Sequence, residues 1–292
     1  HFQSPRAGAS RGGYTVLIMR TPISYYGGKQ SLMHYLLPLI PPHQVYTETF
    51  FGGGSLFWAK NPSGIETIND RLDICINFYK VLKTNYKKLK PLIDQSLISR
   101  TMHNEAKDIC KGKIQCSDPI KRAWAFWYAT NFSFANKIGG GYRYSNDAHT
   151  SVCLTLHLKK QEFTDLLVSR LEHVYIENAD AVKVLKSRNT KDAFHYIDPP
   201  YMNADQGHYK GYTTDDFELL LEWCAIECKG SFLLSNYPSD ILSQYVEKYG
   251  WQMQTLNHSS KHGLKQLHRK KMETIVFNYT PPAYMQAKLF EP

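Results

Sequence analysis

Short β-rich runs alternate with helical runs along most of this chain, and this alternation limits the fold more than any other feature. The β-type runs span residues 45–49, 64–69, 173–176, 193–197, 231–234, 251–256 and 273–279. Helical runs separate most of them, at residues 55–60, 72–82, 179–185, 214–228 and 239–249. The pattern predicts an α/β fold with a doubly wound, mostly parallel seven-stranded sheet covered on both faces. No helix-length pattern joins the last two runs, so we expect an antiparallel C-terminal hairpin at one edge.

A stretch at residues 78–172 interrupts this pattern. Its amphipathic segments predict a mainly helical lobe and lie at residues 86–97, 101–111 and 119–131. The lobe is therefore expected to be an insertion in one α/β domain formed by residues 19–77 and 173–285. Residues 1–18 are rich in Ser, Gly and Arg, and we expect a tag or a flexible arm before a native start at Met19.

The net charge of +9 comes from one internal stretch. Residues 78–170 contain sixteen Lys and Arg against seven Asp and Glu, whereas the rest of the chain is balanced. A concentrated positive charge is typical of proteins that bind a polyanion, since neutralising phosphates releases counterions. A solvated helical surface would show the same excess, so the charge alone leaves both interpretations open.

Aromatic residues interleave with this charge. Trp124, Trp127 and Tyr128 follow helical spacing, which predicts that they pack mainly in the core. Residues 132–144 contain three consecutive glycines and predict an exposed loop, whose aromatic rings can stack on bases. The polar residues that we expect to read base edges around this loop are Asn131, Asn136, Lys137 and Arg143.

Composition excludes several classes of protein. Hydrophobic residues at 42% and charged residues at 21% are globular values, which argues against a disordered or collagen-like chain. No apolar run approaches the roughly 18 residues that a membrane span needs. The six cysteines form no CxxC pair and no His/Cys group has zinc-ligand spacing. We therefore expect free thiols, no metal and no membrane segment.

A glycine-rich turn follows the first β-type run. Glu48 ends that run and Gly52-Gly53-Gly54-Ser55 opens the next helix, so the backbone can approach a ligand closely. The turn lacks the full dinucleotide fingerprint and the Lys-Ser/Thr of a phosphate loop, and a plain strand-to-helix turn is an equal alternative. Asp70 ends the second run, where its carboxylate could accept both hydroxyls of a ribose, cap the following helix, or both.

Asp198-Pro199-Pro200-Tyr201 is the most informative motif. It follows the run at 193–197 and therefore lies at the same carboxyl edge as the glycine turn. Two prolines fix the backbone, so a carboxylate, a rigid carbonyl and an aromatic face are held around a planar group. A Pro-Pro turn remains an alternative, but it would not explain the flanking Asp and Tyr.

Together with Tyr25-Tyr26-Gly27-Gly28-Lys29, these motifs follow one another in the order of a known family. Over most of residues 20–280 the chain resembles the Dam-type DNA adenine-N6 methyltransferases of the D12 class. The resemblance implies a Rossmann-like class I methyltransferase fold, an insertion that recognises double-stranded DNA, and S-adenosylmethionine as the cofactor. The family usually has Pro where Thr49 stands, and the insertion lacks its usual Asn-rich signature, so the recognised DNA sequence is not predicted.

The same resemblance implies roles for individual residues. Those that would bind the cofactor are Tyr25, Gly28, Lys29, Glu48, Phe50, Gly52, Gly54, Asp70, Asp180 and Asp198. Those that would catalyse methyl transfer to a flipped adenine are Asp198, Pro199, Pro200 and Tyr201. Asp198 and the Pro199 carbonyl would accept hydrogen bonds from the N6 amine, while Tyr201 stacks on the base.

A second basic cluster lies between the last two β-type runs. Its residues, which we expect to contact phosphate, are Lys261, Lys265, Arg269 and Lys270. A solvated hairpin tip explains this cluster equally well.

Three other functions share some of these features. A methyltransferase acting on RNA or protein would keep the cofactor site, whereas a non-catalytic DNA-binding relative would keep only the basic insertion. A nicotinamide-dependent oxidoreductase fits less well because the dinucleotide fingerprint is incomplete. For the D12 interpretation we expect a monomer in the cytoplasm of a bacterial or phage-infected cell, with room for a cognate restriction enzyme as a partner.

Overall fold

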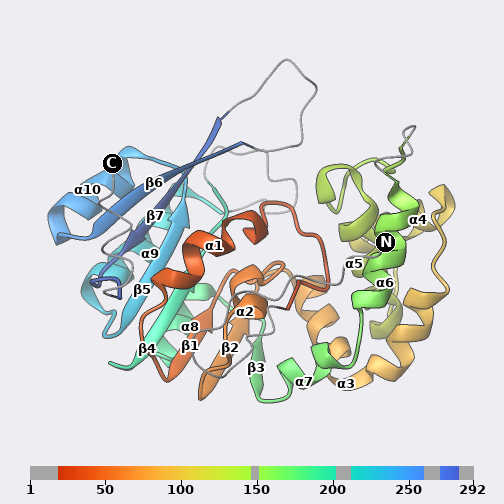
Figure 1. Ribbon diagram of the computed structural model, residues 1–292, viewed down its shortest axis with the longest axis horizontal. Coiled ribbons are helices and arrows are strands. Elements are labelled where there is room, and N and C mark those ends of the chain that lie inside the picture. Colours follow the sequence, from red (N-terminus) through yellow and green to blue (C-terminus); the bar gives the residue numbers. More distant parts are fainter. Residues whose placement is uncertain (1–18, 146–150, 202–211, 260–269, 283–292) are drawn as a thin grey trace, which may run out of the picture.

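A computed structural model describes residues 19–145, 151–201, 212–259 and 270–282, which form a seven-stranded sheet and a helical part beside it (Figure 1). The strands are β1 (Val45–Glu48), β2 (Ile65–Asn69), β3 (Val174–Glu177), β4 (Ala193–Ile197), β5 (Ser231–Asn236), β6 (Gln252–Ser259) and β7 (Lys270–Phe277). The helices of the sheet region are α1 (Met33–Leu36), α2 (Ser55–Ala59), α8 (Ala181–Ser187), α9 (Thr214–Ile226) and α10 (Asp240–Tyr249). The helical part contains α3 (Asp73–Asp94), α4 (Arg100–Cys110), α5 (Pro119–Phe132), α6 (Val152–Glu162) and α7 (Leu166–Leu171). Short 3-10 turns are η1 (Gln30–Leu32), η2 (Leu37–Leu39) and η3 (Phe134–Asn136).

The sheet has the strand order β3-β2-β1-β4-β5-β7-β6. Strands β1 to β5 pair in parallel, whereas β7 is antiparallel to both β5 and β6. This confirms the predicted seven-stranded, mostly parallel sheet with an antiparallel hairpin at its edge. The chain runs outward from β1 to β3 and returns to β4 on the other side of β1, so the order reverses between β1 and β4. Ligands of open α/β sheets bind at such a switch point, at the carboxyl ends of the strands.

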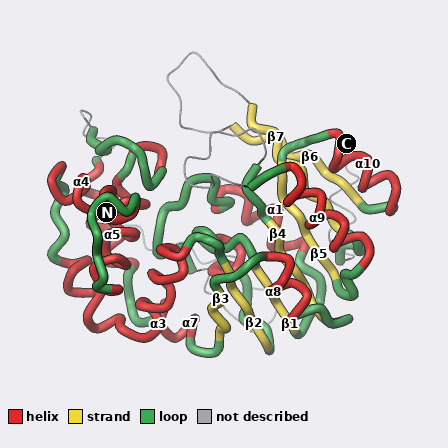
Figure 2. The backbone as a smooth tube through the Cα atoms, turned by 180° about the vertical axis from the view of Figure 1, so that it is seen from behind, coloured by secondary structure: helices red, strands yellow, loops and turns green. Residues whose placement is uncertain are grey.

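Alternate side chains of the strands pack into two cores. In β5, Leu233 joins the core on the side of α1 and α2, whereas Phe232 and Leu234 join the core on the side of α8, α9 and α10. In β7, Ile275 and Val276 divide in the same way. Figure 2, the view from behind, shows α8, α9 and α10 lying across the strands. The period of two therefore buries both faces of the sheet, as expected for a doubly wound fold.

Local sequence accounts for where several helices begin and end. Asp118 accepts a hydrogen bond from the Ile120 N–H, and Pro119 stands in the first turn of α5, where a missing N–H costs nothing. Thr213 and Asp216 form a reciprocal capping box at the start of α9. Gly250 follows α10 with φ of 65°, a left-handed conformation that favours glycine.

Two predicted helices correspond to the two halves of α3. The chain was expected to break between residues 82 and 86, and α3 is kinked there at Asn85, where a φ of −133° and a ψ of 28° are not helical. The predicted break is therefore confirmed as a kink, and Phe78, Leu82 and Leu89 are buried on either side of it. The predicted boundary of the insertion, residue 78, lies inside the first half of α3.

Sequence analysis also missed α1, α6 and α7. Two of these helices, α1 and α7, have only four and six residues, too few for a clear helical period. In α6 the apolar residues do not follow one face, and Leu154 and Leu158 are exposed. Tertiary packing, rather than an amphipathic pattern, determines these three elements.

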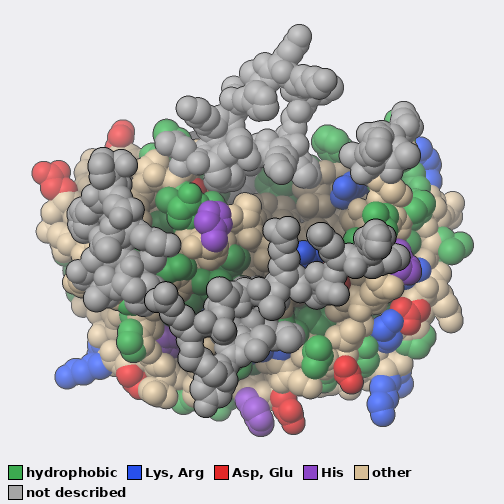
Figure 3. Space-filling view, in the orientation of Figure 1, with side chains coloured by type: hydrophobic (Ala, Val, Ile, Leu, Met, Phe, Trp, Pro, Cys, Tyr) green, Lys and Arg blue, Asp and Glu red, His purple; other side chains and the backbone are tan. Residues whose placement is uncertain are grey.

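The helical part carries the excess of basic residues. On the face drawn in Figure 3, Lys and Arg side chains gather mostly over this part and less over the sheet. None of the helices in the described ranges has the length and apolar character that crossing a bilayer requires. The positive charge found in the sequence thus lies together in space on the helices.

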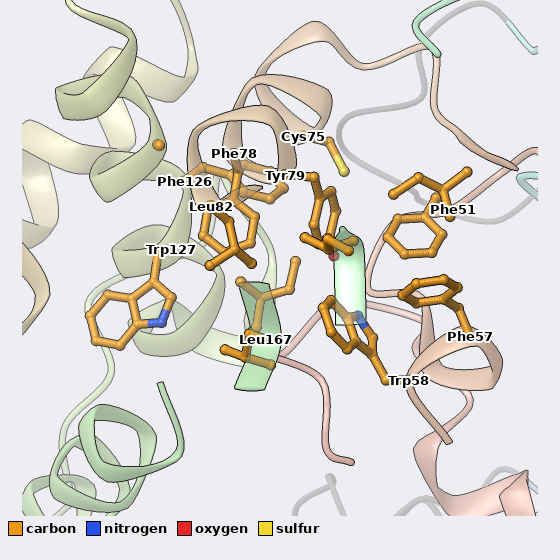
Figure 4. Packing of buried hydrophobic residues seen from close by; sticks show 14 of the residues in the cluster. Phe51, Phe57, Trp58, Cys75, Phe78, Tyr79, Leu82, Phe126, Trp127 and Leu167 are labelled. Carbon is orange, nitrogen blue, oxygen red and sulfur yellow. The ribbon is translucent and has the colours of Figure 1, made fainter. Parts of the chain in front are cut away.

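The helical part shares its core with the sheet. Figure 4 shows a continuous series of buried rings from the sheet region to α5. Trp58 in α2 lies 6.5 Å from Tyr79, measured between ring centroids, and Phe78 lies 5.8 Å from Phe126 in α5. Trp127, predicted to be a core residue, is fully buried in the same cluster. The insertion is therefore packed rigidly against the α/β part rather than joined by a linker.

Replacing Phe78 by Ala tests this continuity. Because the ring fills the junction of both parts, we expect the free energy of unfolding to fall by about 3–5 kcal/mol in urea titrations. The variant Leu97→Ala is the control: its side chain is 67% exposed, and we expect a change within about 0.5 kcal/mol. Circular dichroism and tryptophan fluorescence should report one transition, and two separate transitions would show independent domains.

Candidate active site

The glycine turn after β1 has a backbone that only glycine fits. Gly52 and Gly54 have φ of 45° and 62°. A Cβ atom on Gly54 would lie 2.3 Å from the Phe51 ring, and one on Gly52 would lie 2.7 Å from the Tyr25 ring. Glycine is required at both positions, because the backbone conformation and the close ring contacts each exclude a side chain.

Asp70 holds this turn from behind. Its Oδ2 accepts a hydrogen bond of 2.8 Å from the Gly52 N–H, and its Oδ1 accepts one of 2.9 Å from the Leu72 N–H. Burial raises the pKa of Asp70 to about 6, against the effect of these two hydrogen bonds. Asp70 is 1% exposed and lines neither of the cavities described below. The structure therefore shows Asp70 supporting the turn and the start of α3, and the predicted ribose contact stays a prediction that needs this side chain to turn.

Asp198 follows β4, next to the end of β1, because these strands are neighbours in the sheet. Its Oδ1 accepts a hydrogen bond of 2.9 Å from Lys29 Nζ, and Tyr201 Oη lies 3.2 Å from the same oxygen. Lys29 comes from the N-terminal segment and is 6% exposed. Tyr201 Oη also contacts Lys29 Nζ. Three residues that the sequence singled out from distant motifs therefore meet in one cluster.

A fourth residue, Glu273 of β7, completes the cluster. Tyr201 Oη donates a hydrogen bond of 2.6 Å to Glu273 Oε1, and Lys29 Nζ lies 3.5 Å from the same oxygen. Ser235 Oγ in β5 also donates to it. Sequence analysis missed Glu273; the available signal was a carboxylate in a β-type run that is otherwise rich in apolar residues.

Burial and charge together determine the protonation of these groups. Burial raises the pKa of Asp198 to about 6, with Lys29 opposing and Glu273 adding to the shift. Burial lowers the pKa of Lys29, but Asp198 and Glu273 outweigh it, so the pKa rises and Lys29 keeps its charge. Burial raises the pKa of Glu48 to about 8, although its carboxylate accepts a hydrogen bond from Tyr46. Near pH 7 Lys29 is therefore a cation and Asp198 mostly an ionised carboxylate, while Glu48 is neutral.

Two cavities meet at this edge of the sheet. The smaller, about 80 Å³, is lined by most of the predicted site: Tyr25, Gly28, Lys29, Glu48, Phe50, Gly52, Gly54, Asp198, Pro199, Pro200 and Tyr201. The larger, about 360 Å³, is lined by residues that include Asn69, Asp180, Tyr212 and Trp223. Phe50 lines both cavities, so they are adjacent parts of one groove. Such a groove, with aromatic walls and a few fixed polar groups, is typical of a site for a small organic ligand.

Comparison with known proteins agrees with this geometry. Residues 25–275 match the D12 class N6 adenine-specific DNA methyltransferases. The chain belongs to this family. It is also 26% identical over 280 residues to the Type II methyltransferase M1.LlaDCHI of Lactococcus lactis subsp. cremoris, an alignment that covers 89% of this chain and 96% of the relative. The protein is therefore a DNA adenine methyltransferase, and the resemblance found in the motifs is confirmed.

The methyltransferase does not expose all the residues expected to read DNA. Asn131 lies in the last turn of α5 and is 1% exposed. Its Oδ1 accepts from the Ser24 N–H at 2.9 Å and its Nδ2 donates to the Trp127 carbonyl at 2.9 Å. The helix predicted at residues 119–131 is confirmed, but the side chain of Asn131 is buried and does not reach the surface, as a contact with base edges would require. Asn131 instead ties the N-terminal segment to the helical part.

The other predicted DNA contacts of the methyltransferase are partly exposed or not described. Asn136 has φ of 58° in the turn after α5, and Lys137 Nζ lies 4.6 Å from the centroid of the Tyr26 ring. Arg143 is half-buried near the same turn. Lys261, Lys265 and Arg269 lie outside the described residues, and Lys270 begins β7. In the described part of the chain there is no group of three or more His, Cys, Asp or Glu side chains able to hold a metal ion.

Replacing Glu48 by Gln tests the protonation of the buried site. Glu48 has its ordinary pKa when the chain is unfolded and a pKa of about 8 when folded, so the wild-type protein loses stability as pH rises between these values. We expect Glu48→Gln to remove this loss. Its free energy of unfolding relative to wild type should therefore increase by roughly 3 kcal/mol from pH 5 to pH 9.

Urea titrations at both pH values measure this difference. The exposed residue Glu247 in α10 provides the control, and Glu247→Gln should show no such pH dependence. An equal difference at pH 5 and pH 9 for Glu48→Gln would contradict the raised pKa.

Proposed function

We propose that S-adenosylmethionine is the methyl donor and that it binds in the groove formed by the two cavities. The larger cavity suits a nucleoside, because Tyr212 and Trp223 provide aromatic surface and Asp180 provides a carboxylate. In the smaller cavity the glycine turn lets a ligand approach the backbone closely. The Asp198 carboxylate lines the same cavity and gives it a negative charge. When bound, this donor supplies a methyl group on a positively charged sulfur. The aromatic surface, the carboxylates and the glycine turn therefore match the chemistry of this donor.

The observation that carries the catalytic proposal is the position of Asp198-Pro199-Pro200-Tyr201, which lines the same small cavity as the glycine turn. The N6 amine of adenine is a poor nucleophile because its lone pair is delocalised into the ring. We infer that the Asp198 carboxylate and the Pro199 carbonyl accept its two N–H groups and so localise the lone pair for attack on the methyl group. The site then contributes positioning and electrostatics without a covalent intermediate.

The base must leave the DNA duplex to reach this cavity. Tyr201 and Tyr237 both line it, and their ring centroids lie 4.1 Å apart. We propose that the extruded adenine stacks against Tyr201 at this pair. Unstacking the base opposes binding, and the aromatic contact offsets part of this cost.

DNA binding is assigned to the helical part and the β6–β7 connection. The positive excess of residues 78–170 and the exposed rings of Phe134 and Tyr144 support the helical part as the target-recognition region. Asn136, Lys137 and Arg143 remain its proposed base-reading residues. The Type II methyltransferase relative supports a cognate restriction enzyme as a partner. We place the protein, as a monomer, in the cytoplasm of a bacterial or phage-infected cell.

Replacing Asp198 by Ala tests the catalytic assignment. Because the carboxylate is a main acceptor for the amine, we expect the methylation rate to fall at least about a hundredfold, while DNA affinity changes little. The measurement is incubation of DNA with donor, followed by sequencing that maps N6-methyladenine, with RNA and protein substrates tested beside it. The matched control is Asp192→Ala, an exposed aspartate before the amino end of the same strand. Near wild-type methylation by Asp198→Ala would refute the assignment.

Neutralising Lys261, Lys265 and Lys270 together tests phosphate contact by the β6–β7 connection. Each lost contact reduces counterion release, so the slope of log affinity against log salt should fall by roughly 3, equally for all DNA sequences. The control removes the same charge at exposed sites near the amino ends of β4 and β5 and in α10, by Lys191→Ala, Lys229→Ala and Lys248→Ala. A loss of affinity restricted to the methylated sequence would contradict a phosphate role.

A further inference from the structure

We propose that Glu273 is a positioning residue of the methyl-transfer site: it shares the charge of Lys29 and accepts the hydrogen bond of the Tyr201 hydroxyl, so that Lys29 neutralises the Asp198 carboxylate less and this carboxylate is free to accept the adenine amine. This inference rests on the proposed role of Asp198 and adds a residue that no motif of the chain contains. Glu273 does not face the substrate, and it acts through its two neighbours.

The geometry places Glu273 behind Asp198. Its side chain is 3% exposed and belongs to β7, which is held between β5 and β6. One oxygen, Oε1, meets Tyr201 Oη at 2.6 Å, Lys29 Nζ at 3.5 Å and Ser235 Oγ. Asp198 approaches Lys29 and Tyr201 from the side of the cavity, through Oδ1. Both neighbours of Asp198 are therefore shared with a second, buried carboxylate.

Counting protons shows what this sharing does. Tyr201 has one hydroxyl proton and two carboxylates within reach, Glu273 at 2.6 Å and Asp198 at 3.2 Å. The shorter contact has the geometry of a strong hydrogen bond, so the proton points to Glu273. Lys29 then supplies the donor to Asp198 Oδ1 at 2.9 Å. Within the described residues both of these contacts involve Oδ1, so the second oxygen of Asp198 is left to the substrate.

Counting charges gives the same result. Lys29 contributes one positive charge, and Asp198 and Glu273 contribute one negative charge each, so the cluster is negative by one. Without Glu273, Lys29 and Asp198 would form a neutral pair, because the ammonium group would interact with Asp198 alone. A neutralised carboxylate accepts hydrogen bonds from the amine less strongly and attracts a positively charged donor less.

Among the described residues, the charges of Lys29, Asp198 and Glu273 dominate the electrostatics around Asp198, because the other titratable groups there are neutral. The titratable groups that face it are Lys29 from the N-terminal segment, Glu48 from β1, Tyr196 and Tyr201 from β4 and its end, Tyr237 after β5 and Glu273 from β7. Burial keeps Glu48 protonated near pH 7, since its pKa rises to about 8. Burial also raises the pKa of all three tyrosines, which stay neutral.

The variant Glu273→Gln keeps the shape and the acceptor oxygen but removes the charge. Because the charge of Glu273 raises the pKa of Asp198, the acid limb of the pH–rate profile should move to lower pH, by roughly half a unit to one unit. At pH 8 we expect kcat to fall about tenfold, while KM for DNA stays within about twofold. A merely structural role would change the active fraction or the Tm without moving the acid limb.

Two further variants separate charge from packing. Glu273→Asp keeps the charge and should keep the acid limb of wild type. Ser235→Ala removes one hydrogen bond from the same oxygen without a change of charge and should also keep it. If the acid limbs of Glu273→Gln and wild type coincide, the proposal is overturned.

A binding measurement makes the test independent of catalysis. S-adenosylmethionine carries a positive sulfur, whereas its product, S-adenosylhomocysteine, does not. Calorimetry should show that Glu273→Gln lowers the affinity for S-adenosylmethionine, relative to the affinity for S-adenosylhomocysteine, by roughly three- to tenfold. An unchanged ratio of the two affinities would overturn the proposal. If the wild-type protein prefers S-adenosylmethionine over S-adenosylhomocysteine but methylates no DNA, the proposed function is refuted. The ratio of the two affinities in Glu273→Gln would still decide the role of Glu273.

Discussion

The site depends on one lysine shared by two buried carboxylates. Lys29 comes from the segment before the sheet, Asp198 from the end of β4 and Glu273 from the last strand, and Tyr201 bridges the two acids. A buried ammonium is stable only when it is paired, and here its partners raise its pKa despite burial. The same contacts that stabilise Lys29 fix the orientation of Asp198. The site is therefore complete only when the segment that contains Lys29 and the strand β7 both lie against the end of β4.

The sheet supplies the positions that this interaction needs. Because the strand order reverses between β1 and β4, the glycine turn and Asp198 end side by side. Asp70 supports that turn from behind, and Phe50 lines both cavities. The helical part shares a core with the sheet through Phe78 and its neighbours, so its basic surface has a defined position relative to the groove.

Much of the site was predictable from short sequence motifs. The residues that come together only when distant strands pair were not. Asp198-Pro199-Pro200-Tyr201 was recognisable because its prolines restrict the backbone wherever they occur. Glu273 was not, because its role arises only when β7 pairs beside β5 and brings it to Ser235. The burial of Asn131 was not predicted, because its side chain accepts a hydrogen bond from the N–H of Ser24, which is far away in the sequence.

The sequence by itself determined the alternation of strands and helices, the motifs at the carboxyl edge, the family and the concentration of positive charge. These depend on residue type and on spacing over a few positions. Only the tertiary structure decided that the rings of α3 and α5 share one core with the sheet, that Asp70 holds the turn, and that Lys29 lies between Asp198 and Glu273. The physical reason is that these outcomes depend on burial and on charges brought together from distant parts of the chain, which no local pattern records.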